Sequence, residues 1–187
     1  MKVILASQSP RRRELLKELI SDFEIMAQNV DEVSTQRRPA KRAVELALLK
    51  LGSLPSLYAD ALAVSADTLV YRAGKFYGKP RDKEDARRIL RELSGKKHYV
   101  YTGVAVYFKG RVYTFADKSS VRFKTLSDDE IDAYIATGSP MDKAGAYGIQ
   151  DKQAVASYKG SYSNIVGLPG EKLKKLLNRL LGAQERI

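Results

Sequence analysis

The sequence predicts an α/β fold in which helices flank a mixed, strongly hairpinned β-sheet. Its first part alternates short apolar runs with amphipathic helical patterns, which is typical of strands joined by helices. Its middle holds two long segments rich in valine, tyrosine and phenylalanine on either side of Lys109-Gly110, which indicates a β-hairpin. No repeat or linker interrupts the 187 residues, so we expect a single domain over residues 1–187, or one core with two lobes.

The N-terminal half contains the alternating strands and helices. Apolar periodicity predicts strands over residues 3–6 and 23–27 and helices over 10–20 and 39–51. Small and apolar residues over 62–66 predict a buried strand that ends at the polar pair Asp67-Thr68. A second strand over 69–71 is expected to turn at Ala73-Gly74 into residues 75–77.

The rest of the chain contains the hairpin and three further helices. A helix is predicted over 82–94 because one face is apolar and Gly95 can end it. The hairpin strands are predicted over 98–108 and 111–124. Ser127 and Glu130 form a capping box that opens a helix ending at Gly138. Residues 139–150 are expected to form a loop, 154–158 and 164–166 strands, and 171–181 a helix.

Composition restricts the chemistry and the location. With no cysteine and one histidine, the chain has no disulfide framework, thiolate metal site or histidine-rich cluster, so any metal must bind mainly oxygen ligands. The apolar run at the N-terminus is too short for a secretory signal, and no apolar run has membrane-spanning length. We therefore expect a soluble, cytoplasmic protein that does not bind membranes.

The formal net charge of +11 favours a polyanionic partner, either nucleic acid, an anionic surface or a small phosphorylated ligand. Nucleic-acid-binding proteins usually gather cations on one face and interleave aromatic residues for base stacking. Here lysine and arginine are spread along the whole sequence. Most of the excess charge is thus expected on the solvated surface, and nucleic acid is not the expected partner.

The segment Ser7-Gln8-Ser9-Pro10-Arg11-Arg12-Arg13 places three cations where a helix disfavours them. Ser9 suits the N-cap and Pro10 the first helical position, so the arginines fall beside unpaired N–H groups and the positive end of the helix dipole. Bound phosphate would remove this misfit, because free N–H groups, hydroxyls and guanidinium groups all bind phosphate. The alternative is a solvated basic helix end.

Other polar segments could complete a phosphate site. Asp67 could hold a divalent ion or orient water, and Gly78-Lys79-Pro80 could clamp phosphate. The loop over 141–150 has two glycines that permit close backbone approach to a ligand. The alternatives are a turn or cap for Asp67, a plain turn for Gly78-Lys79-Pro80 and a simple connection for the loop. No Walker P-loop or Ser-His-Asp arrangement is apparent.

Together these segments resemble the Maf family of nucleoside triphosphate pyrophosphatases. The resemblance rests on five blocks in order along the chain: LASQSPRR over 5–12, SADT over 65–68, GKP over 78–80, DKAGAYGIQ over 142–150 and GLP over 167–169. It implies an elongated, twisted mixed sheet with two lobes around a central cleft, as in Maf and ITPase-like folds. It also implies hydrolysis between the α and β phosphates, with a divalent metal such as Mg, Mn or Co.

The resemblance also implies roles for individual residues. Asp67 would be the catalytic carboxylate, as a proton acceptor for water or as a metal ligand, and Glu32 a second metal ligand. The phosphates would be bound by Arg11, Arg12 and Lys79, with Ser7 and Ser9 as further donors. Lys50 falls where the family keeps a lysine that reaches phosphate. The family also tends to form homodimers.

Three positions resemble the dTTP and UTP branch of the family: Arg11, Thr68 and Gln150. The amide of Gln150 can donate to and accept from the edge of a uracil-type base. The first functional hypothesis is therefore a metal-dependent hydrolase of dTTP, UTP and modified pyrimidine nucleotides that removes non-canonical nucleotides from the pool. The alternatives are a nucleic-acid-binding module and a nucleotide-sensing regulator linked to cell division.

Overall fold

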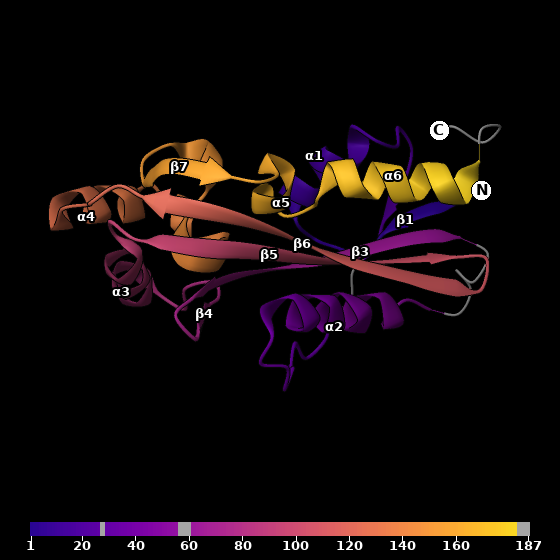
Figure 1. Ribbon diagram of the computed structural model, residues 1–187, viewed down its shortest axis with the longest axis horizontal. Coiled ribbons are helices and arrows are strands. Elements are labelled where there is room, and N and C mark those ends of the chain that lie inside the picture. The colour runs from indigo at the N-terminus through magenta and orange to yellow at the C-terminus, as the bar shows by residue number, and fades with distance from the viewer. Residues whose placement is uncertain (27–28, 56–60, 183–187) are drawn as a thin grey trace. The chain divides into compact units, whose positions relative to one another are not determined.

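The computed structural model describes residues 1–26, 29–55 and 61–182. Figure 1 shows their helices and strands. The strands are β1 (Val3–Leu5), β2 (Glu24–Ile25), β3 (Leu62–Arg72), β4 (Lys75–Tyr77), β5 (Lys97–Phe108), β6 (Arg111–Phe123) and β7 (Val155–Lys159). The α-helices are α1 (Pro10–Lys17), α2 (Pro39–Gly52), α3 (Lys83–Leu93), α4 (Asp128–Ala136), α5 (Tyr162–Val166) and α6 (Gly170–Leu181). Three short 3-10 helices follow α4: η2 (Ser139–Asp142), η3 (Ala144–Ala146) and η4 (Ile149–Asp151).

The strands form one seven-stranded sheet in the order β2-β1-β3-β5-β6-β7, with β4 paired to β3. Strand β1 pairs in parallel with both β2 and β3. The pairs β3–β4 and β6–β7 are antiparallel. The predicted α/β fold with a mixed sheet is therefore confirmed.

The chain divides into two compact units, and β3 passes from one to the other at Asp67. The first unit comprises residues 1–67, 102–117 and 161–187, and the second comprises 68–101 and 118–160. The central cleft and the single domain over residues 1–187 stay predictions. Within the residues that the structure describes, no helix combines the length and apolar character needed to cross a membrane.

In the first unit, helices cover both faces of the sheet. Helices α1 and α6 lie on one side of the strands and α2 on the other (Figure 1). Strand β1 serves both faces because its side chains alternate: Leu5 packs in the core that contains Leu16 and Leu173, whereas Ile4 packs with Ala47 of α2. Burying each such leucine or isoleucine contributes about 1.5–3 kcal/mol, so these contacts fix the end of β1 and the start of α1.

In the second unit, α3 and α4 follow the sequence signals closely. The buried face of α3 carries Ala86, Ile89, Leu90 and Leu93. In α4 both halves of the capping box are present, since Ser127 Oγ accepts from the Glu130 amide and the Glu130 carboxylate accepts from the Ser127 amide. The predicted loop over 139–150 is largely structured as the three short 3-10 helices.

Two hairpin turns were also correctly predicted. The residue pairs Ala73-Gly74 and Lys109-Gly110 all have positive φ, between 47° and 84°. Turns of this kind match the right-handed twist of the flanking strands. Glycine at the second position lowers the conformational energy of the turn, because it adopts positive φ without steric strain.

Several predicted strands also differ from the structure. Residues 62–72 form one continuous strand, so Asp67 lies within β3 and not at a strand end. The strand predicted over 164–166 is wrong: this segment belongs to helix α5, which Ser161 caps by accepting from the Asn164 amide and which ends at Gly167. The strand predicted over 23–27 is reduced to β2, and Ala27 lies outside the described residues.

Candidate functional site

The arginine-rich helix start has the predicted cap. Ser9 Oγ accepts a hydrogen bond from the Arg12 amide at 3.4 Å, and Pro10 takes the first helical position. The Ser9 amide in turn donates to Ser7 Oγ at 3.2 Å, and Ser7 is buried. Leu16 anchors this helix by packing, fully buried, in the core of the first unit. Hydrogen bonds to the side chains of Ser7 and Ser9 and the packing of Leu16 therefore hold the turn after β1 in place.

The structure distinguishes the consecutive cations of this turn. Arg13 is exposed, whereas Arg11 and Arg12 are half-buried. The Arg12 guanidinium donates from Nε to the Gly167 carbonyl at 2.9 Å and from Nη1 to Ser7 Oγ at 3.2 Å. Gly167 ends α5 with φ of 132°, a conformation that favours glycine. The role of this carbonyl was not predicted, because a backbone oxygen leaves no chemical signature in the sequence.

Arg12 lies in an acidic environment. Burial lowers its pKa, while the nearby carboxylates of Asp67 and Glu32 act in the opposite direction. An arginine side chain keeps its proton under all conditions in which proteins fold. Arg12 therefore provides a fixed positive charge next to two acidic groups, at a helix start with its own positive dipole.

Lys50 joins those two acidic groups. Its Nζ lies 2.5 Å from Asp67 Oδ1 and 3.0 Å from Glu32 Oε1. Lys50 comes from the last turn of α2 and Asp67 from the middle of β3. Asp67 is buried, with an exposed fraction of 5 %, whereas the Glu32 side chain is half exposed. The two carboxylates thus converge on one cation at the surface of the first unit.

The Asp67 carboxyl has a perturbed pKa. Burial raises it, and the positive charges of Lys50 and Arg12 oppose that rise. A carboxylate accepts a proton more effectively when its pKa is raised towards the working pH. A buried carboxylate held by a lysine is thus suited to taking a proton from water.

The donors around Lys50 fit a divalent metal. Asp67 and Glu32 supply carboxylate oxygens, the ligands that Mg²⁺ and Mn²⁺ prefer, and both already converge on a cation. No group of three or more acidic, histidine or cysteine side chains in the described part of the chain could hold a metal. A metal here would need further ligands, which phosphate oxygens or water commonly supply.

The second unit brings together two of the predicted blocks. The Gly145 amide donates to the Gly78 carbonyl at 3.0 Å, which ties the Gly78-Lys79-Pro80 turn to the loop over 142–150. Gly145 has a φ of 74° and lies against Val70 of β3, where a side chain would crowd the valine methyl groups. Thr68 is half-buried, and Lys79 and Gln150 are exposed.

A hydrogen-bond network holds the segment that carries Gln150. Tyr134 Oη donates to Asp151 Oδ2 at 2.5 Å and accepts from the Gly148 amide at 3.0 Å. Ser139 Oγ donates to the same Asp151 oxygen at 2.7 Å. Gln150 lies between Gly148 and Asp151, so the hydrogen bonds of these two residues hold the backbone on both sides of it. No local sequence pattern indicates this network, because its members are up to 17 residues apart.

The candidate residues therefore fall into two groups, each described within its own unit. The first unit holds Ser7, Ser9, Arg11, Arg12, Glu32, Lys50 and Asp67. The second holds Thr68, Lys79 and Gln150. The contacts of Arg12 and Lys50 show a cluster in the first unit, whereas the roles of the second group stay predictions from the sequence.

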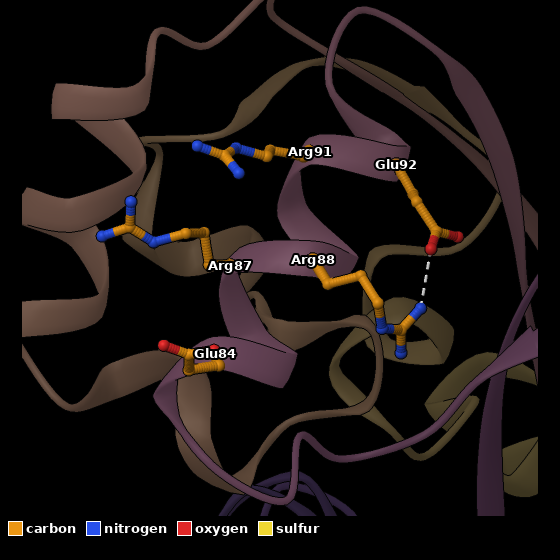
Figure 2. Close-up of a pocket in the computed structure, with 5 residues that line it drawn as sticks. All are labelled: Glu84, Arg87, Arg88, Arg91 and Glu92. Carbon is orange, nitrogen blue, oxygen red and sulfur yellow. Dashed lines mark hydrogen bonds and ion pairs between the residues drawn. The ribbon is translucent and has the colours of Figure 1, made fainter.

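A separate hollow of about 630 Å³ lies on helix α3, and none of the candidate residues lines it (Figure 2). It is lined by Glu84, Arg87, Arg88, Arg91 and Glu92. Arg88 pairs with Asp85 at 2.6 Å and Arg91 with Asp128 at 2.7 Å. Arg87 pairs with Asp132 of α4. Because carboxylates neutralise its arginines, this hollow is better explained as the surface that joins α3 to α4 than as an anion site.

The sequence model of one family, described as Maf-like protein, matches residues 2–180. The chain belongs to the Maf family. The resemblance based on the five sequence blocks is thus confirmed.

Relatives within the family share nearly half of the sequence. A protein of Thermosipho africanus is 48 % identical over 179 residues, covering 95 % of this chain and 92 % of its own. One of Dictyoglomus thermophilum is 46 % identical over 184 residues, covering 95 % of both. Both are named dTTP/UTP pyrophosphatase.

A solved structure supports the fold. The Staphylococcus aureus Ham1 protein matches with a TM-score of 0.54, covering 96 % of this chain and 99 % of its own. Since the two sequences are only 12 % identical, this likeness concerns the fold alone. It agrees with the predicted ITPase-like α/β architecture.

Proposed function

We propose that this Maf protein is a nucleoside triphosphate pyrophosphatase that hydrolyses dTTP, UTP and related or modified pyrimidine nucleotides. The products are the nucleoside monophosphate and pyrophosphate, and the physiological role is removal of unwanted nucleotides from the pool. The names of relatives that share 46–48 % of the sequence support this activity. The observation that carries the proposal is the buried Asp67 carboxylate, held by Lys50 and flanked by Arg12.

In the proposed reaction, water attacks the α-phosphorus and the bond to the bridging oxygen breaks, so that pyrophosphate leaves with the bonding electrons. Asp67 takes the proton from the attacking water, a role that its raised pKa favours. Arg12 and the positive end of the α1 dipole stabilise the phosphate charge, since charge spreads over the oxygens in phosphoryl transfer. Lys50 holds the carboxylate of Asp67 in place.

A divalent cation, Mg, Mn or Co, is part of the proposal. Asp67 and Glu32 are the residues of this chain that would hold it, together with phosphate oxygens. When bound, such an ion supplies positive charge that offsets the negative charge of the phosphates. Metal dependence is expected from this donor set and from the family resemblance.

Base recognition by Thr68 and Gln150 and phosphate binding by Arg11 and Lys79 are proposed from the sequence resemblance. The order of preference among dTTP, UTP and modified bases depends on differences as small as one methyl group, worth about 1–3 kcal/mol. A homodimer and a cytoplasmic location, where nucleoside triphosphates are made and used, complete the proposal.

The substitution Asp67→Asn tests the catalytic assignment. It keeps the shape of the side chain but removes the proton acceptor, so we expect kcat for UTP and dTTP to fall by at least about 10²-fold. Nucleotide binding, measured by calorimetry, should be largely kept. Asp31→Asn, at an exposed neighbour of Glu32, is the matched control and should leave turnover unchanged. Unchanged pyrophosphate release by Asp67→Asn would refute the assignment.

The position of bond cleavage and the metal need a second assay. A panel of canonical and modified triphosphates with Mg, Mn or Co should yield pyrophosphate and the nucleoside monophosphate. Orthophosphate as the first product would contradict cleavage at the α–β bond. Full activity in excess chelator would contradict the metal requirement without affecting the role of Asp67.

A further inference from the structure

One face of the sheet in the second unit carries four aromatic rings in a row. The ring centroids of Phe76 and Tyr71 are 5.1 Å apart, and those of Tyr71 and Tyr101 are 6.4 Å apart. Tyr99 continues the row at 6.5 Å from Tyr101. The rings come from the adjacent strands β4, β3 and β5, and all are half-buried, so part of each is accessible.

The alternation of side chains along β5 explains why these rings are accessible. His98 and Val100 point into the core of the second unit and are buried. Lys97, Tyr99 and Tyr101 point to the opposite face, where they are exposed or half-buried. This face of the strand is thus polar and aromatic, whereas its other face is buried.

Cations lie among and beside the rings. Lys118 Nζ of β6 lies 4.1 Å from the Tyr99 ring centroid and 5.6 Å from that of Tyr101. Lys97 Nζ lies 5.5 Å from the Tyr99 centroid. Arg122 follows on the same face of β6, because residues two apart along a strand point the same way.

Strand β7 extends the basic surface. Ser120 is paired with Lys159 and Arg122 with Ser157, and directly paired residues have side chains on the same face. Arg122 and Lys159 are both exposed. We name the surface formed by the four rings together with Lys97, Lys118, Arg122 and Lys159 the aromatic–basic face. None of these positions is acidic.

We infer that the aromatic–basic face binds single-stranded nucleic acid. Aromatic rings bind unpaired bases by stacking, and lysine and arginine bind the phosphates between them. A stacking base would displace the Lys118 ammonium from the ring and leave it available for phosphate. Double-stranded nucleic acid should bind less well, because its bases are already stacked.

This inference goes beyond the proposed pyrophosphatase activity, which assigns no role to any of these residues. The sequence spreads its lysines and arginines over the whole chain, an observation that argued against a nucleic-acid partner. Yet the pairing of β5, β6 and β7 gathers four of them beside the aromatic row. A charged polymer of nucleotides matches both the positive charge and the rings, whereas an acidic protein would match only the charge.

Fluorescence anisotropy with a labelled 12-nucleotide oligouridine tests the inference. Tyr99→Leu/Tyr101→Leu should weaken binding about tenfold or more by removing stacking. Lys118→Gln/Arg122→Gln should also weaken it and lower the slope of log Kd against log salt by about 0.7 for each lost phosphate contact. The matched control is Lys174→Gln/Lys175→Gln on α6, which removes the same charge from an exposed surface of the first unit.

The control should lose less than about twofold in affinity, and every variant should keep its unfolding temperature and turn over UTP. The inference would be overturned if Lys118→Gln/Arg122→Gln and the control lost equal affinity for the oligonucleotide. It would also be overturned if the unmodified protein showed no measurable binding. Equally tight binding of a 12-base-pair duplex or of polyglutamate would overturn it too, because such binding would point to an unspecific affinity for polyanions. Binding that persists in excess pyrophosphate at matched ionic strength would support a face separate from the triphosphate site.

Discussion

At the scale of single residues, His98 shows how burial sets a protonation state. Its ring is fully buried, with centroids 4.9 Å from that of Phe123 and 5.3 Å from that of Tyr147. Nε2 lies 2.9 Å from Tyr147 Oη, and Nδ1 has no hydrogen-bond partner among the described residues. Desolvation lowers the pKa of His98 to about 4. The imidazole is therefore neutral at pH 7.

This lowered pKa should make the protein less stable in mild acid. The unfolded chain takes up a proton at the ordinary pKa of about 6.5, whereas the folded chain does so only near 4. As the pH falls between these values, the unfolded state gains the proton and stability is lost at up to about 1.4 kcal/mol per pH unit, or about 3 kcal/mol in total. Below pH 4 this contribution stays constant.

The single histidine makes this prediction simple to measure. The imidazole NMR signals of the folded protein should not titrate between pH 7 and 5. In His98→Phe, the free energy of unfolding from urea titrations should depend less on pH over the same window. A folded-state titration midpoint near 6.5 would show that the ring is not buried in this way.

At the scale of elements, a glycine in β5 decides how closely α2 packs on the sheet. A Cβ atom at Gly103 would overlap the backbone of α2 at the Ala43 carbonyl carbon and the Val44 nitrogen. Backbone cannot move aside as a flexible side chain can. Because α2 also carries Lys50, this contact helps to set the position of Lys50 beside Asp67.

The substitution Gly103→Ala should therefore push α2 away from the sheet. We expect the free energy of unfolding to fall by at least about 3 kcal/mol, which is at the upper end of the usual effect of overpacking. We also expect kcat to fall. Gly52→Ala is the control at the end of the same helix, where a Cβ meets nothing within 4 Å and stability should change by less than about 1 kcal/mol. Equal stabilities for the two variants would contradict the close packing, and denaturant titrations measure both.

Elements with strong local signals were the ones that the sequence predicted well. The capping box of α4 and the apolar face of α3 act within a few residues, so their prediction needs no tertiary information. The segment around Ile165 was predicted as a strand, but the cap at Ser161 and the end at Gly167 make it a helix. The polar Asp67 was predicted to end a strand, yet β3 continues through it, and Lys50 pairs with its buried carboxylate.

At the scale of the whole molecule, the sequence predicted the members of the site better than their contacts. Ser7, Arg12 and Asp67 were all named from motifs, and the structure places them in one unit. That Lys50 bridges Asp67 and Glu32 depends on the packing of α2 against β3, which is a long-range property. The hydrogen bond from Arg12 to the Gly167 carbonyl spans 155 residues and could not be inferred from either segment alone.

The net charge of +11 lets anions stabilise the whole molecule in two ways. Any salt screens the repulsion among surplus cations, whereas phosphate groups can also bind at the start of α1. At matched ionic strength, pyrophosphate should therefore raise the unfolding temperature more than chloride does. At about 100 times its Kd, a ligand that binds only the folded state adds about 2.7 kcal/mol of stability.

Substitutions in the arginine turn can separate the two effects, because they remove the same charge from neighbouring positions. Arg12→Gln should abolish the extra stabilisation by pyrophosphate, since Arg12 is held against Ser7 and Gly167 beside Asp67. Arg13→Gln should preserve it, because Arg13 is exposed on the helix surface. Differential scanning fluorimetry in chloride and pyrophosphate measures both variants. If Arg13→Gln lost the effect as fully as Arg12→Gln, general screening would explain it and the anion site at α1 would be wrong.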